Sequence, residues 1–90
     1  MESDDVLDTM LDSLDTDADD AATRARNYRR SERFIRVSAD ACSVTCQGVR
    51  TALVAQANAW AVQADAMERI EQIMRIAADT LRSLPRPVSP

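Results

Sequence analysis

The segment LVAQANAWAVQADAMERIEQIMRIAADTL, residues 53–81, decides the fold of this chain. It contains neither proline nor glycine, and it is rich in alanine, methionine, glutamine, glutamate and arginine, which favour the helix. Large apolar side chains recur every seven residues, at Leu53, Trp60, Met67, Met74 and Leu81. Because a seven-residue repeat keeps side chains on one side of a helix, the segment predicts a long amphipathic helix that buries this side.

The heptad repeat extends toward the N-terminus, because the same series includes Ala39 and Cys46. A companion series follows the first one by three residues, at Ile35, Cys42, Val49, Gln56, Gln63, Ile70, Ala77 and Leu84. Together the two series predict one heptad seam. We expect the interface or core at Ile35, Cys42, Val49, Leu53, Trp60, Met67, Ile70, Ile73, Met74 and Leu81.

The apolar face is wider than the seam of a two-stranded coil. A second stripe runs beside the first, at Phe34, Val37, Ala41 and Val44, and residues 52–66 are rich in alanine. A broad apolar arc favours a bundle of three or four helices over a two-stranded assembly. The fold class is therefore all-α, with long heptad-patterned helices.

The single glycine, Gly48, leaves the number of long helices open. Residues 43–48, SVTCQG, form the weakest helical stretch of the helical domain 20–84, so Gly48 can end one helix. The domain is then a helical hairpin with helices over 20–47 and 49–84. Alternatively, one continuous coiled-coil helix passes through Gly48, because the heptad phase is kept across it. Pro85 ends the last helix, and residues 85–90 are expected to be a disordered Pro-rich tail.

The N-terminal segment is acidic and amphipathic. Residues 1–20 carry nine acidic residues and no base, whereas residues 21–36 carry six arginines and one glutamate. Val6, Leu7, Met10, Leu11 and Leu14 share one helix face, so residues 1–19 predict a short acidic helix or a segment that is disordered until it docks. The stripe resembles the acidic motifs of transcriptional activation segments. It is either a docking motif for a partner groove or part of the chain's own bundle.

The six arginines that follow are candidates for contact with an anion. They are Arg24, Arg26, Arg29, Arg30, Arg33 and Arg36. Phosphate contact is one interpretation, but the adjoining acidic segment would repel nucleic acid. The other interpretation is a solvated helix face that pairs with acidic groups of this chain or of a partner.

The sequence lacks the residue types that several classes of function require. The chain has no histidine, no lysine and no glycine-rich loop, so we expect neither an enzyme nor a cofactor nor a small-molecule substrate. Cys42 and Cys46 are too few for a zinc site, and we expect them to be buried free thiols on one helix face. We see no signal peptide and no membrane span, which predicts a cytoplasmic location, or a nuclear one in a eukaryote.

These observations favour a non-enzymatic module for protein–protein interaction or assembly. A small subunit, a chaperone-like adaptor and a phage-type inhibitor all fit this description, with the chain itself or another protein as the partner. The alternative is a regulator that acts on nucleic acid or its machinery, either through the arginine helix at 24–36 or through residues 1–20 as a mimic of DNA charge.

Overall fold

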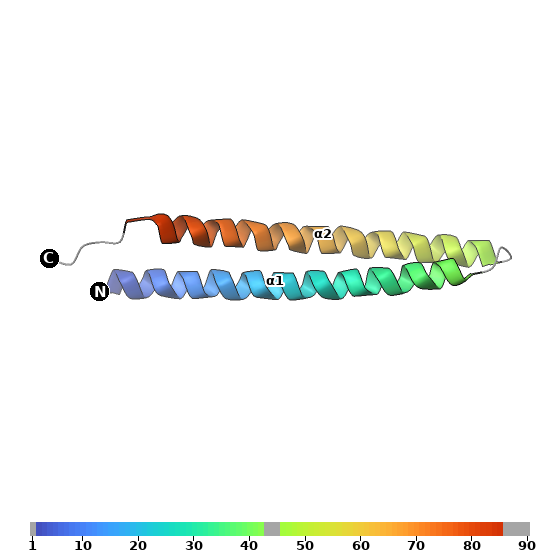
Figure 1. The fold of residues 1–90 in the computed structure, drawn as a ribbon, viewed down its shortest axis with the longest axis horizontal. Coiled ribbons are helices and arrows are strands. Elements are labelled where there is room, and N and C mark those ends of the chain that lie inside the picture. The colour runs from blue at the N-terminus through green and yellow to red at the C-terminus, as the bar shows by residue number, and fades with distance from the viewer. Residues whose placement is uncertain (1, 43–45, 86–90) are drawn as a thin grey trace.

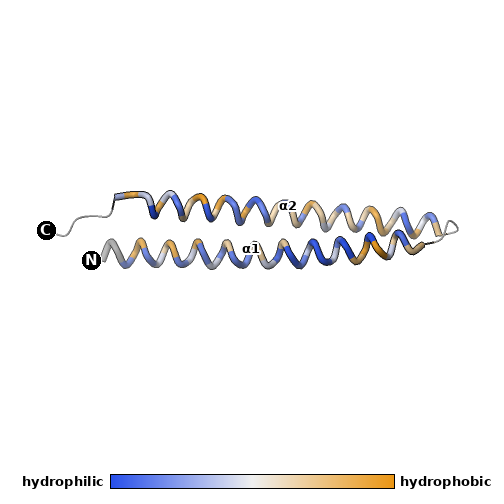
Figure 2. The backbone as a smooth tube through the Cα atoms, viewed as in Figure 1, coloured by the Kyte–Doolittle hydropathy of each residue, from blue (hydrophilic) through white to orange (hydrophobic). Residues whose placement is uncertain are grey.

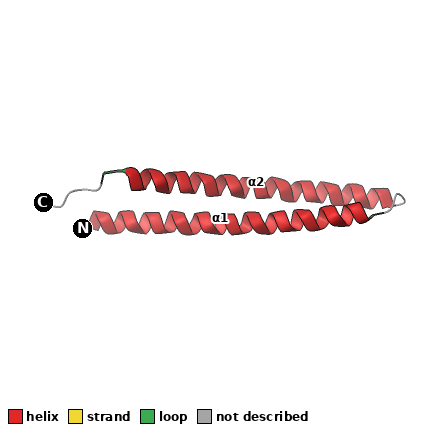
Figure 3. Ribbon diagram, in the orientation of Figure 1, coloured by secondary structure: helices red, strands yellow, loops and turns green. Residues whose placement is uncertain are grey.

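Two long antiparallel helices make up the computed structural model, which describes residues 2–42 and 46–85. Helix α1 spans Glu2–Ala41 and helix α2 spans Gln47–Ser83. They lie side by side along their whole length, so that the beginning of α1 adjoins the end of α2 (Figure 1). The result is a rod with extents of 77 × 14 × 12 Å. The expected all-α hairpin is confirmed, and the described part of the chain contains only helices and their short flanks (Figure 3).

The reversal of the chain lies between Ala41 and Gln47 and not at Gly48. The prediction of one continuous helix is therefore wrong. Gly48 belongs to the first turn of α2, where its φ is not positive and a Cβ atom would meet nothing within 4 Å. The prediction that Gly48 ends the first helix is also wrong. A glycine that ends a helix usually has the left-handed conformation, with a positive φ, and Gly48 does not. Val44 belongs to the interval 43–45, outside the described residues.

At its other end, α2 stops where the sequence predicts. Leu84 is extended, with φ −69° and ψ 141°, as expected of the residue before a proline. The predicted tail, apart from Pro85, lies in residues 86–90, outside the described residues.

The acidic segment is not a separate short helix. Helix α1 continues without interruption from Glu2 through Asp19 and Asp20 to Ala41. A helix of some 13 residues is marginal alone in water, and most helical stability in proteins comes from packing. The last half of α2 supplies that packing, because it runs beside the acidic segment (Figure 1).

The seam between α1 and α2 is built from heptad positions of both helices. In α1 it consists of Leu7, Leu11, Leu14, Ala18, Ala21, Ala25, Tyr28, Glu32, Ile35 and Ala39, and in α2 of Leu53, Ala57, Trp60, Ala64, Met67, Glu71, Met74, Ala78 and Leu81; all of these are buried or half-buried. Among the residues whose burial the structure describes, every buried one is an alanine apart from Leu11. The seam is therefore close-fitting but thin.

Within the seam, small side chains of one helix face large ones of the other. Ion pairs between Asp19 and Arg75 and between Arg29 and Glu68 fix the antiparallel register. Ala21 of α1, for example, lines one depression together with Met67 and Met74 of α2. The alternation lets the two helices approach closely while the larger partner fills the space.

The predicted companion series does not lie in the seam of α2. Val49 is 58% exposed, and Gln56 and Gln63 are exposed as well. The second seam series of α2 is one residue further along, at Ala57, Ala64, Glu71 and Ala78. The error has a physical cause: alanine carries little apolar surface, so its heptad repeat is weaker in the sequence than that of larger side chains.

Candidate interaction surface

One edge of the hairpin is held by ion pairs between the helices. Arg75 pairs with Asp19 at 3.0 Å, and Arg82 pairs with Asp15. Farther along α1, Arg29 bonds Glu68 through two nitrogens, at 3.0 and 3.2 Å, and also reaches Asp65. These are exposed or half-exposed pairs, which contribute little stability each but select the register in which opposite charges meet.

Glu32 occupies a seam position where its neighbours in the series are Ala25 and Ala39. Its carboxylate accepts from Arg36 at 2.9 Å and from Arg29 at 3.2 Å, and its side chain is 15% exposed. These bonds, that from Arg36 first, lower the pKa of Glu32 below its ordinary value of 4.5. The pKa of Arg29 is raised, chiefly by its bond to Glu68. The two arginines thus keep the glutamate ionised inside an otherwise apolar series.

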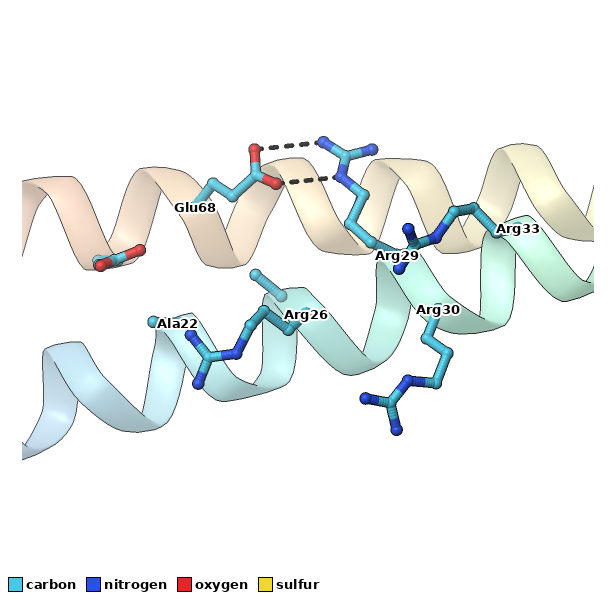
Figure 4. A pocket seen from close by; sticks show the side chains of 8 residues that line it. Ala22, Arg26, Arg29, Arg30, Arg33 and Glu68 are labelled. Atoms are coloured by element: carbon cyan, nitrogen blue, oxygen red, sulfur yellow. Dashed lines mark hydrogen bonds and ion pairs between the residues drawn. The ribbon is translucent and has the colours of Figure 1, made fainter.

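The six arginines of α1 do not form one patch. Arg29 and Arg36 are engaged with Glu32, and Arg36 also donates to the side-chain oxygen of Asn58 at 3.1 Å. Four arginines line an open depression of about 350 Å³ together with Glu68 and Glu71, namely Arg26, Arg29, Arg30 and Arg33 (Figure 4).

Arg24 lies apart from that depression. It lines another one, of about 240 Å³, with Asp17, Asp20 and apolar residues of α2. A single basic surface of six arginines is therefore not present on the described residues.

The predicted docking stripe of the acidic segment is divided. Leu11 is buried, at 6% exposure, and Leu7 and Leu14 are half-buried in the seam. Val6 and Met10 remain exposed, at 59% and 48%. Packing within the chain therefore accounts for three of the five residues and leaves two uncovered.

Helix α2 carries a second heptad stripe that flanks the seam on the side opposite the ion pairs between the helices. We name it the uncharged face, and it consists of Val49, Ala52, Gln56, Ala59, Gln63, Ala66, Ile70, Ile73, Ala77, Thr80 and Leu84. None of these residues is charged, although the stripe runs the full length of the helix. Nine of them are exposed, and Ile70 and Ala77 are half-buried. Ile73 is 65% exposed, and Ile76 next to the stripe is 57% exposed.

Near the chain reversal, the apolar surface continues onto α1. Trp60 packs against Tyr28, with ring centroids 5.4 Å apart and planes at 33°. Trp60 also lines a shallow, largely apolar depression of about 390 Å³ with Ile35, Gln56 and Phe34. Phe34 is 72% exposed and Val37 is 67% exposed. Figure 2 shows this apolar end of α1 beyond its hydrophilic middle, and the apolar residues spread along α2.

The predicted core residues fall into two groups. Ile35, Leu53, Trp60, Met67, Met74 and Leu81 lie in the seam, and Cys42 is half-buried just after α1. Val49, Ile70 and Ile73 lie on the uncharged face. The sequence signal for that face is present but easily missed: it is the absence of charge at a 3-4 spacing, and the exposed positions cannot be told from the seam by periodicity alone.

The cysteines do not share a buried helix face. Cys42 follows the end of α1 and is half-buried, whereas Cys46 precedes α2 and is exposed. The prediction of two buried thiols is wrong because the chain reverses between them. Among residues 2–42 and 46–85, no group of three side chains is placed to hold a metal ion. Neither described helix is long and apolar enough to cross a membrane.

No family model, no curated protein and no solved structure matches the chain. The candidate surface therefore rests on the geometry of the hairpin alone.

Proposed function

We propose that the chain is a non-enzymatic assembly module that binds a protein partner through the uncharged face of α2. One observation carries the proposal: eleven heptad-spaced positions, from Val49 in α2 to Leu84 just after its end, lack any charge, and nine of them are exposed. A helix of a self-sufficient hairpin would place charged residues on the side away from its seam. The opposite edge of this hairpin does so, with its arginines and carboxylates.

The thinness of the seam supports the same proposal. In the described part of the chain no large side chain is fully buried, while Phe34, Val37, Val62 and Ile73 are each more than 60% exposed. Burial of apolar surface contributes about 25 cal/mol per Å², so much of the available stabilisation of this chain is not used by the hairpin itself. A partner that covers these side chains supplies it.

The experiment compares two glutamate variants of neighbouring residues. Ile73→Glu places a charge on the uncharged face, whereas Gln72→Glu places the same charge on a side of α2 that bears no part of this face. Each tagged chain is expressed in its source cell, and extracts are separated by size. We expect the wild type and Gln72→Glu to elute in a larger species than Ile73→Glu. Co-elution of the wild type and both variants at the position of the lone hairpin would contradict the proposal.

Contact with nucleic acid is a second candidate, favoured by the depression that Arg26, Arg30 and Arg33 line (Figure 4). The described residues show no ion pair at these three arginines, so their charge is available to phosphates. The test is fluorescence anisotropy of a labelled duplex at 50 and 200 mM salt. Steep loss of binding across this range, abolished by Arg30→Gln with Arg33→Gln, would support it. Absence of binding at 50 mM salt would exclude it.

A further inference from the structure

The charges of α1 change sign near its middle. The first half carries nine acidic residues without a base, and residues 21–36 carry a net charge of +5. The ion pairs within the hairpin neutralise only part of this charge. Asp12, Asp17 and Asp20 on one side, and Arg24, Arg30 and Arg33 on the other, have no ion pair within the described part of the chain. Of these residues, Asp17, Asp20 and Arg24 follow one another at spacings of three and four, so they share one side of α1, which is acidic before the middle of the helix and basic after it.

The exposed apolar residues of α1 are also arranged symmetrically about its middle. Val6 and Met10 are exposed near the start of α1, and Phe34 and Val37 are exposed near its end. When two copies of α1, each spanning Glu2–Ala41, are aligned antiparallel about residue 22, Met10 of one copy lies level with Phe34 of the other. In the same alignment Asp20 lies level with Arg24, and Val6 lies within one residue of the level of Val37.

We propose that the partner covering the uncharged face is a second copy of this chain, stacked antiparallel on the first to form a four-helix bundle. This inference rests on the proposed function and identifies the partner that covers the uncharged face. The two-fold axis crosses the rod at its middle, so that α1 packs on α1 and α2 packs on α2 of the second copy. Every neighbouring pair of helices is then antiparallel, an arrangement common in four-helix bundles.

Charge selects the antiparallel arrangement over the parallel one. With the two copies of α1 parallel, Asp17 and Asp20 would face their own counterparts, and Arg24 would face Arg24. Like charges brought together in this way oppose association, whereas the antiparallel arrangement places acidic ends on basic ends. In α2, where the stripe is uncharged, the same two-fold axis brings Ile70 and Ile73 of both copies to the centre of the contact.

The area available agrees with a stable dimer. Helix α1 has 40 residues and is about 60 Å long, so a contact strip of about 10 Å, the width of one helix, would bury on the order of 600 Å² on each copy, to which the stacked part of α2 adds. Each partner of a standard protein–protein interface buries about this area. Four helices also enclose a core between the layers, which the thin seam of one hairpin lacks.

The first test is the mass of the purified full-length chain, measured by sedimentation equilibrium. We expect twice the chain mass of 9.9 kDa. Ile73→Glu should raise the dissociation constant by more than about tenfold, because two unpaired carboxylates meet near the axis, and Gln72→Glu should leave it unchanged. Circular dichroism checks that both variants keep their helix content, as expected for exposed positions.

The second test measures orientation and does not depend on the glutamate variants. Thr9→Cys, in a chain with Cys42→Ser and Cys46→Ser, carries one spin label on the exposed side of α1. The antiparallel bundle places the two labels about 40 Å apart, since residue 9 of one copy lies level with residue 35 of the other. A parallel dimer would bring them within about 20 Å of each other, as adjacent helices are roughly 10 Å apart.

The outcomes separate this inference from the proposed function. A dimer with labels about 40 Å apart, weakened by Ile73→Glu alone, supports the bundle. A monomer at all concentrations, or a dimer with the shorter label distance, overturns it. If the purified chain is monomeric while the species in cell extract still depends on Ile73, the proposed function stands with a different partner.

Discussion

The seam and the uncharged face of α2 have nearly the same composition but opposite environments. Both repeat every seven residues and both mix alanine with larger apolar side chains, yet Ala57 and Ala64 are buried while Ala59 and Ala66 are exposed. The difference arises from α1, which covers only one side of α2. Its aspartates and arginines bond to Arg75, Arg82 and Glu68 at the edge of the seam. Apolar periodicity thus indicates which faces of a helix can be buried. The charged residues beside a face determine whether it packs against the other helix of the same chain.

The largest difference between the seam and the exposed part of α2 is expected for Trp60→Ala compared with Val62→Ala. Trp60 is half-buried in the seam and stacks on Tyr28, so its truncation should lower the free energy of unfolding by about 2 kcal/mol, less than for a fully buried tryptophan. Val62 is 68% exposed, and its truncation should change stability by less than about 0.5 kcal/mol. Urea unfolding followed by circular dichroism, at one low protein concentration, measures both. Equal effects would mean that Trp60 is not part of the seam.

A change from small to large tests the alternation across the seam. Ala64→Leu should lower the free energy of unfolding by about 1–3 kcal/mol, because Ala64 is fully buried in the seam. Ala55→Leu makes the same change at an exposed position of α2 and should alter stability by less than about 0.5 kcal/mol. The same urea titration gives both values. If Ala64→Leu stabilised the chain, the close approach of the helices at this level would be disproved.

Sequence reasoning predicts the helices better than it predicts their faces. The all-α hairpin, the end of α2 before Pro85 and the half-buried series from Leu53 to Leu81 are all found in the structure. These features follow from local chemistry, namely helix propensity, the proline block and large side chains at one spacing. The continuity of α1 through Asp19 and Asp20 is not local, because it depends on α2 lying alongside.

The uncharged face shows the same limit more clearly. The companion series through Val49, Ile70 and Ala77 is a true heptad stripe, and its periodicity is indistinguishable from that of a seam. The alanines at 57, 64 and 78 determine which of the two stripes packs against α1, because their small side chains permit the closest approach of the two helices. The ion pairs of Arg29 and Arg75 span 36 to 56 residues along the chain, and no spacing rule within one helix could indicate them.

A smaller and pH-dependent difference is expected at Glu32. Hydrogen bonds from Arg36 and Arg29 lower its pKa below the ordinary value of 4.5, so the ionised form stabilises the fold. That contribution is complete above pH 4.5 and is lost as the pH falls through the lowered pKa. Glu32→Gln should therefore lower the melting temperature near pH 7, and its difference from the wild type should narrow below pH 4.5. Melting curves at several pH values show this, and a difference that is independent of pH would refute the role of the charge.

The smallest effect is expected at the exposed edge, where Arg75→Gln is compared with Arg69→Gln. Both changes remove one positive charge from α2, but only Arg75 bonds carboxylates in the described structure, Asp19 at 3.0 Å and Glu71 at 2.9 Å. Arg75→Gln should lower the melting temperature slightly at low ionic strength, and the loss should vanish near 1 M salt, where the screening length is about 3 Å. Arg69→Gln should have no such salt-dependent effect, because its side chain has no carboxylate to release. If the two variants behaved equally, the effect would come from the net charge and not from the ion pairs of Arg75. The fit of alanine against large side chains in the seam would then select the register.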